Sequence, residues 1–132
     1  MKTILLIALV LSGCRKDYYD TRLEITNNSD TPIYVNISDF YKDTNYVYVN
    51  YNPGNAPEQY KIQPKETKSA IRPIGTWEKA FQEDDTIAFY FFDAEIIENS
   101  SWDSVRSNYL ILKRSDYTLG DLINLHWTLI YP

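Results

Sequence analysis

The chain has 132 residues, with 13 Lys and Arg against 18 Asp and Glu, which gives a net charge of −5. This acidic balance leaves no basic stripe to hold phosphates and argues against a nucleic-acid partner. The length suits a single domain, and the one cysteine rules out a disulfide within the chain.

The N-terminus has the pattern of a secretory signal. Met1 and Lys2 form a short positive region, Thr3–Leu11 an apolar region, and Ser12-Gly13 the small residues at which a signal peptidase cuts. The apolar run is too short for a membrane span, because crossing a hydrocarbon core takes roughly 20 helical residues. We therefore predict a signal peptide over residues 1–13.

The only cysteine follows this run directly. Leu11-Ser12-Gly13-Cys14 resembles the lipobox of bacterial lipoproteins, and the resemblance implies that Cys14 is acylated after cleavage. The alternative is a buried thiol at the end of a core helix, but a charged segment begins immediately after Cys14. Two or three acyl chains make a lasting anchor, since each buried methylene contributes about 0.8 kcal/mol. Residues 14–20 would form a lipidated tether, with the membrane as partner.

The residues after Cys14 bear on location. Arg15-Lys16-Asp17 resembles the signals that send some lipoproteins of Bacteroidota-type bacteria to the outer face of the outer membrane. We expect an outer-membrane protein, facing either the periplasm or the cell surface, with the surface favoured. Loss of Met1–Gly13 removes one lysine and no acid, which leaves a net charge of −6. Acyl chains, and not charge, would hold such a chain on anionic lipid.

The body of the chain alternates in the manner of short strands. Leu23 and Ile25 share one face of the first run, and Ile33, Val35 and Ile37 share one face of the second. The predicted strands are Thr21–Thr26, Pro32–Ile37, Asn45–Tyr51, Tyr60–Ile62, Thr67–Ile71, Thr86–Phe92, Tyr109–Lys113 and Leu125–Tyr131.

Two features of these strands indicate their arrangement. Gln63–Glu66 has turn chemistry between two runs and predicts a hairpin. Thr86–Phe92 is apolar at both alternating positions, which is typical of a central strand covered on both faces.

Short helices are expected in the connections. Thr76 and Ser101 precede segments with helix-start chemistry, and Thr118 with Asp121 forms a capping box. We predict that residues 21–132 form one all-β domain. It would be an antiparallel Greek-key or immunoglobulin-like β-sandwich of about seven to eight strands, with two or three helices of one to two turns.

Much of the mature chain resembles one group of proteins. The segments "CRKDYYDTRLEITNNSDTPIYV", "TWEKAF", "DTIAFYFFDAE", "SWDSV", "YLILKRSDYTLGDL" and "HWTLIYP" resemble small uncharacterised lipoproteins of the Bacteroidota type. The resemblance implies an envelope location and one β-rich domain of unknown function, so no catalytic residue is carried over. The group often has Asn before the final Trp, where this chain has His126.

The inventory for catalysis is small. With Cys14 acylated no thiol nucleophile remains, and His126 is the only imidazole, expected at the surface of the last strand. A His/Cys zinc site lacks ligands, and the four isolated glycines form no phosphate-binding loop. We therefore predict a non-enzymatic protein with no catalytic residue, no cofactor and no metal.

Acidic clusters leave one alternative open. Asp93, Glu95, Glu98 and Asp103 lie within one connection, and Glu83–Asp85 form a second group. A small hydrolase, for example one that acts on glycans, could use two such carboxylates, and a calcium ion could sit among them. Solvated or structural roles are the interpretation that we favour.

The aromatic residues suggest a binding function. Phe40, Tyr41, Tyr46, Tyr48 and Tyr51 crowd one segment. If Val47 and Val49 face the core, then Tyr46 and Tyr48 point outward, where flat rings suit a glycan or an envelope protein. The alternative is that tyrosine simply favours strands and packs across them. The predicted function is a non-catalytic binding or assembly module of the cell envelope.

Overall fold

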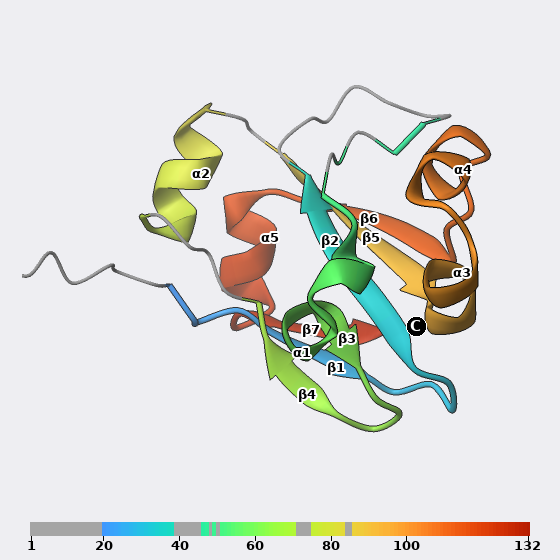
Figure 1. Cartoon of the computed structure of the whole chain (residues 1–132). Coiled ribbons are helices and arrows are strands. Elements are labelled where there is room, and N and C mark those ends of the chain that lie inside the picture. The colour runs from blue at the N-terminus through green and yellow to red at the C-terminus, as the bar shows by residue number, and fades with distance from the viewer. Residues whose placement is uncertain (1–19, 39–45, 48, 50, 71–74, 84–85) are drawn as a thin grey trace, which may run out of the picture.

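The computed structural model describes residues 20–38, 46–47, 49, 51–70, 75–83 and 86–132 (Figure 1). These residues form seven strands, five short α-helices and one 3-10 turn. In chain order the elements are β1 (Glu24–Asn27), β2 (Ile33–Ser38), η1 (Pro53–Asn55), α1 (Pro57–Tyr60), β3 (Lys61–Ile62), β4 (Thr67–Ser69), α2 (Trp77–Glu83), β5 (Ile87–Asp93), α3 (Ala94–Asn99), α4 (Trp102–Ser107), β6 (Lys113–Tyr117), α5 (Leu119–Asn124) and β7 (Thr128–Tyr131).

The described strands form two open sheets, in the orders β4-β1-β7 and β3-β2-β5-β6. Neighbours in the four-stranded sheet run antiparallel, with Val35 opposite Phe91. β1 pairs antiparallel with β4 but parallel with β7, where Ile25 lies opposite Leu129. The prediction of an antiparallel sandwich is therefore wrong for this pair. β1 and β7 stand near opposite ends of the chain, so no tight turn forces opposite directions on them.

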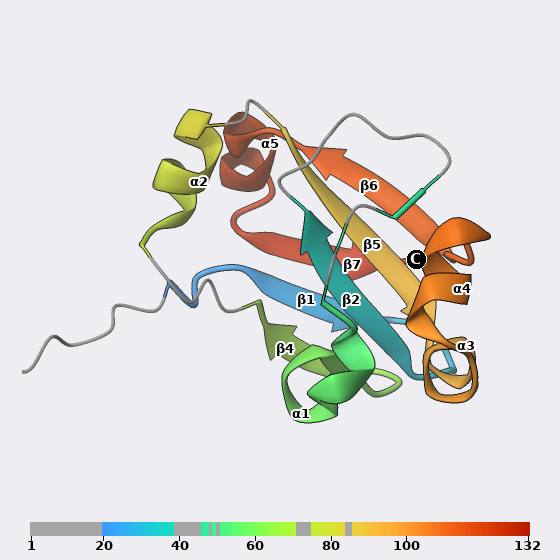
Figure 2. The same ribbon diagram turned by 45° about the horizontal axis from the view of Figure 1, so that its top comes forward.

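The first hydrophobic core lies between the two sheets. Ile25 and Leu129 from the three-stranded sheet, with Leu23 just before β1, pack with residues of the other sheet: Ile33, Val35, Ile87, Phe89 and Phe91. The helices α2 and α5 add Trp77 and Leu122, and they lie side by side at one end of the molecule (Figures 1 and 2). The inward positions predicted for β1 and β2 are confirmed. The fold is β-rich, with two sheets arranged as in a β-sandwich.

A second core covers the other face of the four-stranded sheet. There Tyr34, Tyr90 and Phe92 pack with Val47 and Val49 and with residues of α3 and α4. Figures 1 and 2 both place α3 and α4 at the opposite end from α2 and α5. Because both faces are covered, β5 is buried from Ile87 to Phe92, which confirms the predicted central strand.

The predicted helix starts are confirmed. The side-chain oxygens of Ser101 and Thr118 cap α4 and α5, and the Thr118 Oγ1 atom accepts a hydrogen bond from the Asp121 N–H at 3.1 Å. Thr76 precedes α2 and accepts from the Lys79 N–H at 3.3 Å. The prediction of two or three helices is wrong, because the described residues form five. The sequence interpretation missed α1, whose last residue it assigned to a strand, and α3, which it treated as an acidic connection. Asp93, the last residue of β5, is the N-cap of α3, so no loop residue separates the two elements.

The turn predicted near Pro64 is present, but the predicted hairpin is wrong. β3 joins β2 in one sheet, whereas β4 joins β1 in the other. Buried Asn27 holds this crossing, because its side-chain amide donates to the Ile62 carbonyl at 3.1 Å. Its backbone carbonyl also accepts from the Lys65 N–H at 2.7 Å. The turn is therefore bound to β1, and the two strands that it connects, β3 and β4, belong to different sheets.

The predicted strand Tyr109–Lys113 is also wrong, because the strand β6 begins at Lys113. Tyr109 has a positive φ of 53°, and the Leu110 N–H donates to the Val105 carbonyl at 3.0 Å. These bonds end α4. Tyr109 and Ile111 both pack on the second core. The alternation of apolar residues here therefore comes from the segment that follows α4, and not from a strand.

The last predicted strand, Leu125–Tyr131, is shorter than expected. β7 begins at Thr128, since His126 and Trp127 have positive φ values of 53° and 58° and turn the chain after α5. The prediction that Leu125 and Leu129 share a face is wrong, because Leu125 is exposed and Leu129 is buried. His126 lies at the surface, as expected.

Candidate binding surface

Of the five aromatic residues predicted to bind a ligand, the structure describes Tyr46 and Tyr51. Phe40, Tyr41 and Tyr48 lie outside the described residues. Tyr46 and Tyr51 belong to the segment 46–51, of which the structure describes Tyr46, Val47, Val49 and Tyr51. The predicted strand Asn45–Tyr51 is wrong over these residues, because none of them is in a strand. Val47 and Val49 are buried in the second core, as the alternation predicted.

Side chains from two elements, α4 and β2, hold the described residues of this segment in place. The Arg106 Nε atom on α4 donates to the Val47 carbonyl at 3.0 Å, and the Trp102 Nε1 atom donates to the Val49 carbonyl at 3.2 Å. The Asn36 Nδ2 atom on β2 donates to the Tyr51 carbonyl at 3.0 Å. These bonds satisfy carbonyls that no ladder partner serves. The segment is therefore fixed by tertiary contacts.

Tyr46 is half-buried at the start of this segment. The Arg106 guanidinium lies 4.8 Å from the centre of its ring, within the range of a cation–π contact. Tyr46 thus packs against α4 and does not stand freely outward as the alternation suggested. Its ring is less accessible to a ligand than that of Tyr51.

Tyr51 pairs with a tyrosine that the sequence interpretation did not include. The ring centres of Tyr51 and Tyr60 are 5.6 Å apart, with their planes tilted by 49°. Tyr51 is 46% exposed, whereas Tyr60, the last residue of α1, is half-buried against the second core. Burial, and then the neighbouring Tyr51, raise the pKa of Tyr60 above its usual value. Together Tyr51 and Tyr60 present an aromatic surface, which we call the tyrosine pair.

A polar cluster follows the tyrosine pair in the chain. Lys61, next to Tyr60, forms an ion pair with Glu98 on α3, and the Tyr34 hydroxyl donates to the same carboxylate at 3.1 Å. Burial, and then Glu98, raise the pKa of Tyr34 to about 12. The pKa of Glu98 is lowered, first by its hydrogen bond from Lys61. Glu98 therefore ties α3 to β2 and β3.

The other acidic residues considered for catalysis also have structural surroundings. The Asp93 Oδ1 atom accepts from the Glu95 N–H at 2.7 Å and caps α3. Glu95 and Asp103 are exposed in the first turns of α3 and α4, where a carboxylate is favourable to the helix dipole. Asp84 and Asp85 lie outside the described residues, as does the side chain of Glu83.

Two further features concern metals and membranes. Within the described ranges, no three His, Cys, Asp or Glu side chains are grouped so that they could hold a metal ion. Over the same part of the chain, no helix combines the length and the apolar character needed to cross a bilayer.

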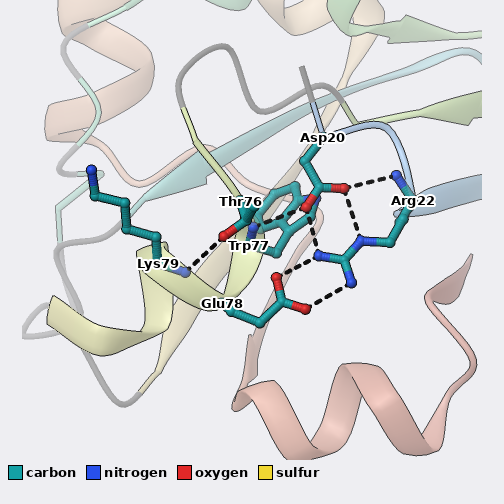
Figure 3. A network of polar contacts seen from close by, with 6 residues as sticks. All are labelled: Asp20, Arg22, Thr76, Trp77, Glu78 and Lys79. Atoms are coloured by element: carbon teal, nitrogen blue, oxygen red, sulfur yellow. Dashed lines mark hydrogen bonds and ion pairs between the residues drawn. The ribbon is translucent and has the colours of Figure 1, made fainter. Parts of the chain in front are cut away.

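A separate network joins the start of the described chain to α2 (Figure 3). The Arg22 guanidinium donates to Asp20 through Nε at 3.0 Å and Nη2 at 2.6 Å, and to Glu78 through Nη1 at 2.7 Å. The Asp20 Oδ2 atom also accepts from the Trp77 N–H at 3.0 Å. Asp20, assigned to the tether from the sequence, is buried, so the packed domain begins no later than this residue.

Comparison of the chain with protein-family models, with curated proteins and with solved structures gave no match. The resemblance to small lipoproteins therefore stays an expectation from the sequence.

Proposed function

We propose that the protein is a lipid-anchored protein of the bacterial outer membrane. Its domain would be a non-catalytic binding or assembly module, and its partner a glycan or an envelope protein. We keep the Greek-key or immunoglobulin-like type of sandwich as part of this proposal, which the two stacked open sheets support. Between the two possible locations, we favour the cell surface over the periplasmic side.

The observation that carries the proposal is the tyrosine pair, in which the exposed Tyr51 is held in place by its neighbours. An aromatic ring contributes most to binding when it is held in place beforehand, because little conformational entropy is then lost on association. Tyr51 meets this condition, since Asn36 holds its backbone and the Tyr60 ring supports its own. Tyrosine also combines an apolar ring with a hydroxyl, which suits sugar rings and protein side chains alike.

The carboxylates give the alternative of a hydrolase no such support. Asp93 caps a helix, and Glu98 accepts bonds from Lys61 and Tyr34. A carboxyl group that acts as a general acid has a raised pKa, whereas the pKa of Glu98 is lowered. The binding function is therefore the one that we carry forward.

Acylation of Cys14 is the first expected result. Expressed with its own signal in a Gram-negative host, the protein should partition into the detergent phase. Its N-terminal peptide should begin at Cys14 and carry the mass of acyl chains, measured by mass spectrometry. Cys14→Ala should be neither acylated nor cleaved at this position. A cleaved wild-type protein with a free Cys14 thiol would contradict the anchor.

Loss of binding on truncation of Tyr51 is the second expected result. The full chain in detergent is screened against envelope glycans and envelope extracts, and the partner found is titrated against variants. Tyr51→Ala should weaken binding by about thirtyfold, which corresponds to about 2 kcal/mol for an aromatic anchor. Tyr51→Phe should keep most of the affinity, because it keeps the ring.

Ile130→Ala is the matched control for this titration. Ile130 is an exposed apolar residue on β7, in the other sheet, and its truncation should leave binding unchanged. Thermal unfolding of each variant separates lost binding from lost folding. If Tyr51→Ala and Tyr60→Ala both bind the partner as wild type does, the tyrosine pair is not the site.

A further inference from the structure

The chain enters the packed domain at the end formed by α2 and α5. Asp20, the first described residue, accepts a hydrogen bond from the Trp77 N–H at the start of α2. Arg22 contacts Glu78 on α2 (Figure 3). Its guanidinium also lies 4.3 Å from the centre of the Trp127 ring, just beyond α5. Asp20 is only 2% exposed. The entry point is therefore fixed to this end of the molecule.

The length of the tether limits how far this end can be from an anchor at Cys14. Six residue steps separate Cys14 from Asp20. A chain advances at most about 3.5 Å per residue, so the two Cα atoms are separated by about 20 Å at most. An acylated Cys14 would thus keep the end with α2 and α5 close to the bilayer surface.

The same end exposes two large apolar side chains. Ile123 in the last turn of α5 is 51% exposed, and Leu125 at its C-cap is 44% exposed. Leu122 fills the core from α5, so Ile123 points away from it, and the turn through His126 directs Leu125 outward. Single exposed apolar residues are common at surfaces, but here two lie within one turn, beside the entry of the tether.

We propose that Ile123 and Leu125 insert into the headgroup region of the bilayer and orient the domain on the membrane. This inference rests on the proposed anchor at Cys14. A lipid surface is the partner to expect, because the short tether brings this surface to the bilayer in every copy of the protein. The mature chain has a net charge of −6, so the contact with lipid must be apolar rather than electrostatic.

This orientation has a consequence for the tyrosine pair. Tyr60 packs in the second core, whereas Trp77 and Leu122 of α2 and α5 pack in the first. The four-stranded sheet lies between these two cores. A domain that rests on the α5 surface would therefore present the tyrosine pair on the side of the sheet away from that surface, accessible to a partner.

An environment-sensitive fluorophore tests the orientation. Cys14 is the only cysteine, so in the acylated protein an introduced thiol can be labelled alone. Ile123→Cys and Leu125→Cys carry the label in two variants, and Glu95→Cys, exposed on α3 at the other end, is the matched control. Each is reconstituted into vesicles of phosphatidylethanolamine and phosphatidylglycerol. The labels at 123 and 125 should shift to the blue and lose emission when nitroxide-labelled lipid is included, and the label at 95 should not.

A second arm separates this inference from the anchor itself. Met1–Gly13 is replaced by six histidines, Cys14 is changed to Ser, and the protein is held on the same vesicles by nickel-chelating lipid. If native Cys14 is not acylated, the anchor fails, but the labels at 123 and 125 should still respond in this arm. In this arm, Ile123→Asp with Leu125→Cys should reduce the quenching at 125. Equal quenching at 123, 125 and 95 in this arm, or no quenching at 123 and 125, overturns the proposed surface.

Discussion

Phe91→Ala is expected to lower the free energy of unfolding by about 3–5 kcal/mol, because it leaves a cavity in the first core. Phe91 is buried in the central strand β5, and its ring stacks on Tyr131 with the ring centres 5.0 Å apart. The backbone is paired with β2 and β6 on either side, so the strand cannot move in to fill the space. Urea titration followed by tryptophan fluorescence measures the change.

Leu112→Ala is the control for this cavity. Leu112 lies just before β6, near Phe91 in space, since its N–H donates to the Phe91 carbonyl at 2.8 Å. Its side chain is 46% exposed, so truncation should change the free energy of unfolding by less than about 0.5 kcal/mol. A loss at Phe91→Ala no larger than that of the control would contradict the position of β5 between two covering layers.

Asp20→Ala should lower the free energy of unfolding by about 3 kcal/mol at pH 7. The substitution removes a buried carboxylate that accepts bonds from Arg22 and from the Trp77 N–H, and hydrogen bonds to charged groups are worth about 1.5–3 kcal/mol each. It also leaves the Trp77 N–H without this acceptor. A chain that begins at Thr21, the boundary predicted from the sequence, lacks Asp20 and should be destabilised to a similar extent. Urea titration of both proteins provides the measurement.

The same carboxylate predicts how stability depends on pH. Hydrogen bonds from Arg22 are the main reason that the pKa of Asp20 falls from 3.8 to about 2 in the folded protein. A lowered pKa stabilises the folded state above pH 3.8, and this contribution is lost as the pH falls toward 2. The difference in free energy of unfolding between wild type and Asp20→Asn should therefore shrink by about 2 kcal/mol between pH 5 and pH 2.

Asp116→Asn is the matched control for Asp20. Arg114 and Asp116 form a pair with the same spacing of two residues, at 2.8 Å, but Asp116 is at the surface. A pair with a solvent-exposed carboxylate contributes less than a buried one, so Asp116→Asn should lower the free energy of unfolding at pH 7 by less than Asp20→Asn does. If Asp20→Asn behaves like Asp116→Asn, the network in Figure 3 does not hold the start of the domain.

Strand β5 and the helix caps were predictable from the sequence for local reasons. Six apolar residues in succession require cover on both faces, whichever layers supply it, and Ser101 and Thr118 cap helices through atoms within a few residues. The burial of Val47 and Val49 was predictable in the same way, from alternation alone. Alternation was misleading at Tyr109–Lys113, because a segment that follows a helix and packs on a core can also place every second side chain inward.

The candidate binding surface was predictable only in part. Tyr51 was named because aromatic residues crowd its segment, but its partner Tyr60 comes from α1 and was assigned to a strand. The helix-start signals of α1, Pro57 at its first position and Glu58 in its first turn, were overlooked. The residues that hold the segment, Asn36, Trp102 and Arg106, come from β2 and α4. The residues that flank these three in the sequence give no indication that they contact the segment.

Local sequence patterns were enough to predict a signal with Cys14 behind it, the positions of most strands and caps, and the residues of the central strand. Each depends on neighbours within a few positions. Three features became visible only in the folded molecule: β3 and β4 join different sheets, β7 runs parallel to β1, and Asp20 belongs to the domain. These features depend on contacts between residues far apart in the chain, such as Asn27 with Ile62 and Asp20 with Trp77. Such contacts cannot be read from local periodicity, because they stabilise the protein only once the layers have packed together.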